Sequence, residues 1–183
     1  MKFKEKTIEL KNGTQAKFKN PSVDDAAELL ECMRQICSET DYLLRYPEEW
    51  DAFTVEREAK WIEANQNSDS NLFICCYVDG KIAGNCNIDF HKGLKIEHRA
   101  VIGIALLKEF WGLGIGTAMI EELIKAAREY GTEILELEYI EGNERGRRLY
   151  EKFGFKAVCE KPNAFKLKDG RMLSEIHMQK DLR

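Results

Sequence analysis

Three glycines at alternate positions stand directly before a stretch of helical periodicity, in residues 110–123 (FWGLGIGTAMIEEL). Gly112, Gly114 and Gly116 each lower helix propensity by about 1 kcal/mol relative to alanine. Apolar residues nevertheless recur behind them at the spacing of a buried helix face. Bare backbone at a helix start exposes N–H groups at the positive end of the helix dipole, and no Cβ blocks an approaching ligand. The stretch is therefore expected to bind an anion, such as a pyrophosphate.

Other glycine motifs fit this stretch less well. A Walker A loop needs a lysine before the Ser or Thr that follows its last glycine, and Gly116-Thr117 lacks that lysine. A dinucleotide fingerprint has the spacing G-x-G-x-x-G after the first strand, whereas this chain has G-x-G-x-G far from its first strand. A purely structural turn between a strand and a helix stays open as the alternative.

A second stretch, residues 136–155 (ELEYIEGNERGRRLYEKFGF), places chemistry-bearing groups behind an alternating strand. Asn143 is positioned to cap a short helix over residues 144–153 that ends at Gly154. Tyr150 on that helix carries a phenol with an ordinary pKa near 10, so it keeps its proton at neutral pH and can act as a general acid. The alternative for Tyr150 is a packing tyrosine on an amphipathic helix.

Together the two stretches resemble the GNAT superfamily of N-acetyltransferases. Residues 111–116 are similar to its acyl-CoA signature, Gln/Arg-x-x-Gly-x-Gly/Ala, with Trp111 standing where Gln or Arg is usual. The positions that match the second family pattern are Asn143, Leu149, Tyr150, Gly154 and Phe155. The order of the expected elements matches the family over roughly residues 14–182, nearly the whole chain.

This resemblance implies one α/β domain over residues 1–183, with a mixed central sheet of about six or seven strands flanked by helices. The Asn12-Gly13 turn between two short alternating segments predicts a hairpin at about residues 6–19. In the family fold the fourth and fifth strands, here about residues 97–107 and 133–140, splay apart and leave a cleft.

The resemblance also implies acetyl-CoA as cosubstrate and no metal. Its pyrophosphate is expected on the glycine turn, and its pantetheine arm along the end of the preceding strand and beside Asn143. The expected cofactor-binding residues are Leu106, Leu107, Gly112, Leu113, Gly114, Ile115, Gly116, Thr117 and Asn143.

Tyr150 and Glu97 are the expected catalytic residues. The phenol would protonate the leaving thiolate, and Glu97 lies where some family members place a carboxylate that deprotonates the amine through water. On a strand, the neighbouring His98 would point to the opposite face. Glu138 on the next strand, or solvent, are the alternatives to Glu97.

Residues 38–50 (SETDYLLRYPEEW) are expected to cover the acceptor end of the cleft. Glu39 and Asp41 would attract an ammonium group, and Tyr42 would line an apolar wall. The alternative is a solvated loop whose aromatic residues pack on the core.

Composition excludes several other classes of protein. The net charge of −4 argues against nucleic-acid binding. No apolar run approaches the roughly 18 residues of a membrane span, and the N-terminus lacks the apolar segment of a signal peptide. Six cysteines without a CxxC pattern indicate buried thiols in a reducing cytoplasm rather than a disulfide or metal framework. A homodimer is compatible with the sequence.

The expected function is N-acetylation, in which the primary amine of a small molecule or peptide attacks acetyl-CoA directly in a ternary complex. The alternatives are a non-catalytic acyl-CoA-binding or sensing domain and an acetyltransferase for protein N-termini or lysines. Tyr150 favours an enzyme, because a sensor needs no acid beside the sulfur. The bulky aromatic residues between positions 42 and 50 favour a lid over a small molecule.

Overall fold

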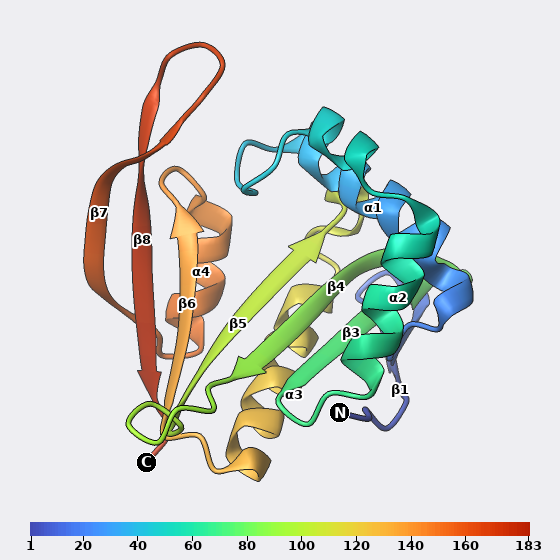
Figure 1. The fold of residues 1–183 in the computed structure, drawn as a ribbon, viewed down its shortest axis with the longest axis horizontal. Helices are drawn as coiled ribbons and strands as arrows, with labels where there is room; N and C mark the ends of the chain where they lie inside the picture. The colour runs from blue at the N-terminus through green and yellow to red at the C-terminus, as the bar shows by residue number, and fades with distance from the viewer.

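A computed structural model describes all residues from Met1 to Arg183. Eight strands form one sheet, with helices on both of its faces (Figure 1). The elements are β1 (Lys6–Glu9), β2 (Gln15–Lys19), the 3₁₀ helix η1 (Val23–Asp25), α1 (Ala26–Glu39), η2 (Pro47–Ala52), α2 (Val55–Gln66), β3 (Asn71–Val78), β4 (Lys81–Phe90), β5 (Arg99–Leu106), η3 (Lys108–Phe110), α3 (Ile115–Tyr130), β6 (Ile134–Ile140), α4 (Glu144–Lys152), β7 (Lys156–Lys166) and β8 (Met172–Asp181).

Local turn and capping residues set several of these boundaries, as the sequence predicts. The Asn12-Gly13 turn joins β1 to β2, and Gly13 has a positive φ of 82°. At the start of α2 the Thr54 side chain accepts a hydrogen bond from the Arg57 amide at 3.2 Å. Such a cap satisfies one of the backbone donors that every helix start leaves open.

The strands lie in the order β1-β2-β3-β4-β5-β6-β8-β7. Every neighbouring pair is antiparallel except β5 and β6, which are parallel. A parallel pair requires a crossover connection, and α3 supplies it between β5 and β6.

Two apolar cores lie on the two faces of the sheet. Residues of α3 and Tyr150 of α4 pack on one face in a cluster of 25 buried residues. Residues of α1 and α2 pack on the other face in a cluster of 11. After Asn71, the run LFICCYV of β3 is apolar because its alternate side chains enter both cores: Ile74 and Cys76 the first, Phe73 and Cys75 the second.

The parallel pair β5 and β6 stays together for only part of its length. The strands are paired from Arg99 with Ile134 to Val101 with Glu136, and beyond these positions they diverge. Figure 1 shows the two strands running apart toward their carboxyl ends. The expected splay of the two strands is therefore present.

The fold differs from the sequence-based expectation in two details, the number of strands and the start of β5. The sheet has eight strands rather than six or seven. Strand β5 begins at Arg99, so the expected strand start at residue 97 belongs to a turn. Strand β7 extends to Lys166, because the β7–β8 hairpin continues past an irregularity in its register between Lys161 and Phe165.

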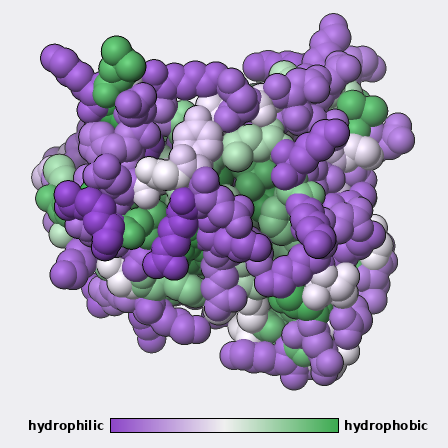
Figure 2. Space-filling model, turned by 90° about the horizontal axis from the view of Figure 1, so that it is seen from below, coloured by the Kyte–Doolittle hydropathy of each residue, from purple (hydrophilic) through white to green (hydrophobic).

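Hydrophilic residues predominate on the face of the molecule drawn in Figure 2, and hydrophobic residues show mainly in the recesses between them. None of the helices combines the length and the apolar character needed to cross a membrane.

Candidate active site

A cavity of about 550 Å³ opens where β5 and β6 separate. The last five residues of β5 (102–106) form one wall, and the end of β6 (137–140) forms the other. The glycine turn borders the cavity, as does the chain after α1. Apolar side chains make up most of its lining, which is typical of a ligand site with a few placed polar groups.

The glycine turn brings the N-terminus of α3 to the cavity. Gly112, Gly114, Gly116 and Thr117 line it, whereas the side chains of Leu113 and Ile115 do not. Gly114 is the N-cap at a φ of 103°, which favours glycine, and a Cβ there would meet no protein atom within 4 Å. No side chain caps the helix and its first turn carries no acidic residue. The first N–H groups of α3 are thus open to an anion such as the pyrophosphate of acetyl-CoA.

The end of β5 offers main-chain groups to the cavity. The Leu107 N–H donates to the carbonyl oxygen of Ala83, a residue of β4, at 3.0 Å. The Leu107 side chain is buried and does not line the cavity. Because hydrogen bonding alternates along an antiparallel pair, the N–H groups of Ile104 and Leu106 face the splayed side instead. Of the two leucines predicted to bind pantetheine, Leu106 lies at the site and Leu107 does not.

Tyr150 lies at the cavity and is 8% exposed. Burial, and to a lesser degree the neighbouring Tyr139, raise its pKa to about 12. The two rings lie 6.2 Å apart between centroids. A phenol in this environment stays protonated near neutral pH, so Tyr150 brings a proton donor to the cavity lining.

Asn143 has the capping role that the sequence predicts and also lines the cavity. Its Oδ1 accepts a hydrogen bond from the Gly146 amide at 2.9 Å, which fixes the first turn of α4. A Cβ on Gly146 would lie 2.8 Å from the Asn143 side chain, so the missing Cβ permits this close cap.

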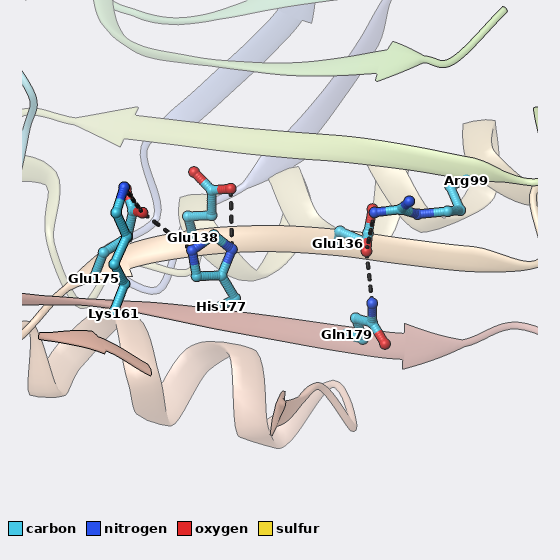
Figure 3. Close-up of polar contacts among 7 residues, drawn as sticks. All are labelled: Arg99, Glu136, Glu138, Lys161, Glu175, His177 and Gln179. Atoms are coloured by element: carbon cyan, nitrogen blue, oxygen red, sulfur yellow. Dashed lines mark hydrogen bonds and ion pairs between the residues drawn. The ribbon is translucent and has the colours of Figure 1, made fainter. Parts of the chain in front are cut away.

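A row of charged side chains lies on β6 and β8 at the cavity. His177 Nδ1 is 3.2 Å from Glu138 Oε1, and His177 Nε2 is 3.0 Å from Glu175 Oε2. Glu138 and Glu175 both line the cavity. Figure 3 shows this group and a second one further along β6 and β8, in which Glu136 binds Gln179 and also Arg99 of β5. Two carboxylates thus line the cavity, and Glu175 also lies 3.7 Å from Lys161 Nζ.

Glu97 lies outside this arrangement. It is an exposed residue of the turn between β4 and β5, and it does not line the cavity. The cavity opens at the carboxyl end of β5, whereas Glu97 precedes the amino end. The structure therefore does not bring Glu97 to Tyr150. Glu138, the alternative carboxylate, does line the cavity.

The chain after α1 meets the cavity through only one of its three predicted residues. Tyr42 lines the cavity, and its ring lies against Gly142 at the end of β6. Glu39 accepts a hydrogen bond from the Lys108 amide at 2.7 Å, and Asp41 lies 3.6 Å from Arg171. Neither carboxylate lines the cavity, so their charges stabilise the chain around it.

Several cavity residues give no recognisable signal in the sequence. Glu175 belongs to a strand that pairs with β6 only across a long separation in the chain. Arg145 is an exposed residue in the first turn of α4, where a charged side chain is usually only solvated. Its guanidinium carbon nevertheless lies 5.1 Å from the centre of the Trp111 ring. Of the two carboxylates that line the cavity, only Glu138 is suggested by the sequence, as an alternative base on the strand after β5.

Fold and site together define an acyltransferase that uses an acyl-CoA donor: parallel strands splay around a cleft, and a glycine turn opens a helix N-terminus to it. Comparison with known proteins gives the family. The model of the acetyltransferase (GNAT) family matches residues 39–155. The chain belongs to the GNAT family of acetyltransferases, and it is an acetyl-CoA-dependent acyltransferase.

Individual relatives agree with this assignment. An N-alpha-acetyltransferase of Sulfurisphaera tokodaii is 27% identical over 159 residues, which cover 82% of this chain and 86% of the relative. A GNAT-family acetyltransferase of Streptococcus pneumoniae superposes with a TM-score of 0.84 at 24% identity, covering 91% of this chain and 99% of that one. A putative acetyltransferase of Salmonella typhimurium, solved with its cofactor acetyl-CoA, has a TM-score of 0.77 at 19% identity and covers 92% and 94%. The structural matches support the fold.

Proposed function

We propose that this protein transfers the acetyl group of acetyl-CoA to the primary amine of a small molecule or peptide while both substrates are bound. One observation carries the proposal. The cavity between β5 and β6 has an anion-binding glycine turn at its border, a protonated phenol in its lining and carboxylates at the end of β6 and β8.

The side chains of this cavity divide the chemistry between them. Acetyl-CoA supplies an activated thioester, and the Ile104 and Leu106 N–H groups are available to hold its arm or its carbonyl oxygen. Tyr150 holds a proton that it can give to a departing sulfur. Glu138 can take the proton that the amine must lose, with His177 fixing the carboxylate in place.

The acceptor is expected to be a cation before it reacts. Glu138 and Glu175 line the same end of the cavity, and an ammonium group would offset their negative charges. Tyr42 and Leu44 add apolar surface beside them. An α-amine at a peptide N-terminus is one such acceptor, and similarity to the Sulfurisphaera tokodaii N-alpha-acetyltransferase favours it. A homodimer and a cytoplasmic location stay predictions.

The direct test is release of free thiol from acetyl-CoA across polyamines, amino acids, aminoglycosides and peptides. We expect turnover with at least one primary amine, and none with the same compound after chemical acetylation of that amine. Absence of turnover across the panel by a folded protein that binds acetyl-CoA would contradict the proposal.

Glu138→Gln tests the base within the same assay. Glutamine cannot accept the proton, so we expect kcat to fall by about 10²-fold at neutral pH. The deficit should shrink as the pH approaches the pKa of the acceptor amine, near 10 for an alkylamine, because the amine then arrives deprotonated.

Glu136→Gln is the matched control, because Glu136 lies two residues earlier on the same strand face but outside the cavity lining. We expect it to keep kcat within a few-fold of the wild type. A pH-independent deficit in Glu138→Gln, or an equal deficit in Glu136→Gln, would remove Glu138 from the role of base.

A further inference from the structure

Trp111, the residue that leads into the glycine turn, brings no charge of its own to the anion site. Its indole N–H is already used, because Nε1 donates to the Leu106 carbonyl at 2.8 Å. The ring instead supports two cations: Lys108 Nζ lies 5.8 Å and Arg145 Cζ lies 5.1 Å from its centre. Trp111 is therefore placed to orient cationic side chains rather than to bind an anion itself.

Of these two cations, Arg145 lies at the cavity. It is the second residue of α4 and lines the cavity together with Trp111 and Gly112. Its Nη2 lies 3.6 Å from the point that a Cβ on Gly112 would occupy, so the guanidinium reaches the glycine turn itself. A ring that keeps a guanidinium beside the turn reduces the side-chain freedom that ligand binding would otherwise remove.

Arg145 forms no ion pair, unlike Arg147 on the same helix. The acidic residues of α4, Glu144 and Glu151, both pair with Arg147, at 3.5 Å each. No carboxylate pairs with Arg145, although Glu144 is adjacent to it in sequence. Its charge is therefore free to meet an anion that enters from the cavity.

A second free cation reaches the turn from the N-terminal hairpin. The Lys11 amide donates to the Leu113 carbonyl at 3.2 Å, so the β1–β2 turn rests directly on the glycine turn. Lys11 also lines the cavity and pairs with no carboxylate. Two elements far apart in the chain thus each place one cation beside the N-terminus of α3.

We propose that Arg145, supported by the Trp111 ring and assisted by Lys11, binds the diphosphate of the CoA donor beside the glycine turn. The planar guanidinium fork matches two phosphate oxygens, and Lys11 adds a point charge. Backbone N–H groups of α3 alone provide only partial charges. This assignment rests on the proposed function, because it takes acetyl-CoA as the ligand of the cavity.

The test measures dissociation constants by calorimetry for CoA, 3′-dephospho-CoA and pantetheine. For Arg145→Gln we expect the Kd of CoA and of 3′-dephospho-CoA to rise about 10-fold, and that of pantetheine, which has no phosphate, to stay unchanged. Arg145→Lys should recover part of the loss, since it keeps the charge but not the fork. Lys11→Gln should raise the Kd of CoA about 3-fold, and added salt should reduce both effects.

Arg148→Gln is the control, because Arg148 lies on the same helix, is exposed and does not line the cavity. It should bind CoA as the wild type does. An unchanged Kd of CoA in Arg145→Gln would overturn the assignment, and so would an equal loss for pantetheine, which would indicate packing. A loss for CoA without one for 3′-dephospho-CoA would place Arg145 on the 3′-phosphate and overturn the diphosphate assignment.

The same measurements separate this inference from the function on which it rests. Wild-type protein that does not bind CoA would overturn both. Wild-type protein that binds CoA and loses affinity on Arg145→Gln, but acetylates no amine, would overturn the proposed function and leave the phosphate assignment supported.

Discussion

Burial of Tyr150 raises its pKa to about 12, and this shift determines what the residue can do. The phenol is neutral below its folded-state pKa and loses its proton only as the pH rises through that value. An acid with an unshifted pKa would begin to lose activity near pH 10. At Tyr150 the protonated form persists through the whole neutral and moderately alkaline range.

Tyr150→Phe removes the proton while keeping the ring against Tyr139 and Phe155. We expect kcat to fall by about 10²-fold or more, with the Kd of CoA nearly unchanged. In the wild type, kcat should show no alkaline decline that depends on Tyr150 below about pH 11. Steady-state rates from pH 7 to 10.5, measured on both proteins, check these statements.

Tyr130→Phe is the matched control for that substitution, because Tyr130 stacks on Phe90 at the end of α3, away from the cavity. Its kcat should equal that of the wild type. Wild-type turnover in Tyr150→Phe under chemistry-limited conditions would make Tyr150 a packing residue.

Among the elements, those with local signals could be predicted from the sequence. The Asn12-Gly13 turn and the apolar residues behind Gly116 are each read within a few positions, and the corresponding hairpin and helix are present. The glycine turn is compatible with both interpretations of its sequence, a structural turn and an anion-binding helix start. Gly114 needs its positive φ for the turn, and the same bare backbone opens the helix start to a ligand.

Contacts between distant elements could not be predicted in this way. The strand start expected at Glu97 was wrong because alternation does not show where a turn gives way to a paired strand. The contact of His177 with Glu138 depends on the register of β8 against β6. That of Arg145 with Trp111 depends on how α4 lies over the glycine turn. None of these contacts produces a periodic pattern in the sequence from which it could be predicted.

Two segments meet across the acceptor side of the cavity, the chain after α1 and the tip of the β7–β8 hairpin. Arg171 lies 3.6 Å from Asp41, Lys168 pairs with Glu48, and the Lys168 amide donates to the Tyr46 hydroxyl at 2.9 Å. The first segment carries Tyr42 into the cavity. These surface contacts are expected to position the acceptor rather than to take part in the chemistry.

Arg171→Gln tests that role. Exposed ion pairs are weak because water screens them, so we expect the acceptor KM to rise only about 2- to 3-fold, less at high salt, with the Kd of CoA unchanged. Arg183→Gln removes a comparable exposed pair with Asp181 at the C-terminus and should leave both constants as they are. A fall in CoA affinity with an unchanged acceptor KM would place the hairpin tip on the donor side.

For the whole molecule, the layout of the sheet points to direct transfer between two bound substrates. The glycine turn, proposed for the donor, and the β6 and β8 carboxylates, proposed for the acceptor, line the same cavity. The thiols of the central strands are poor nucleophiles, because burial raises the pKa of Cys76 to about 12 and those of Cys75 and Cys86 well above the ordinary range. We therefore expect one open cleft to hold acetyl-CoA and the amine together.

Initial rates of thiol release, measured over a grid of acetyl-CoA and acceptor concentrations, test this claim most directly. Direct attack in a ternary complex predicts double-reciprocal lines that intersect, and an intact protein mass that acetyl-CoA alone leaves unchanged. Parallel lines, together with a protein that becomes acetylated when no amine is present, are the signature of a covalent acetyl-enzyme. That result would contradict the account.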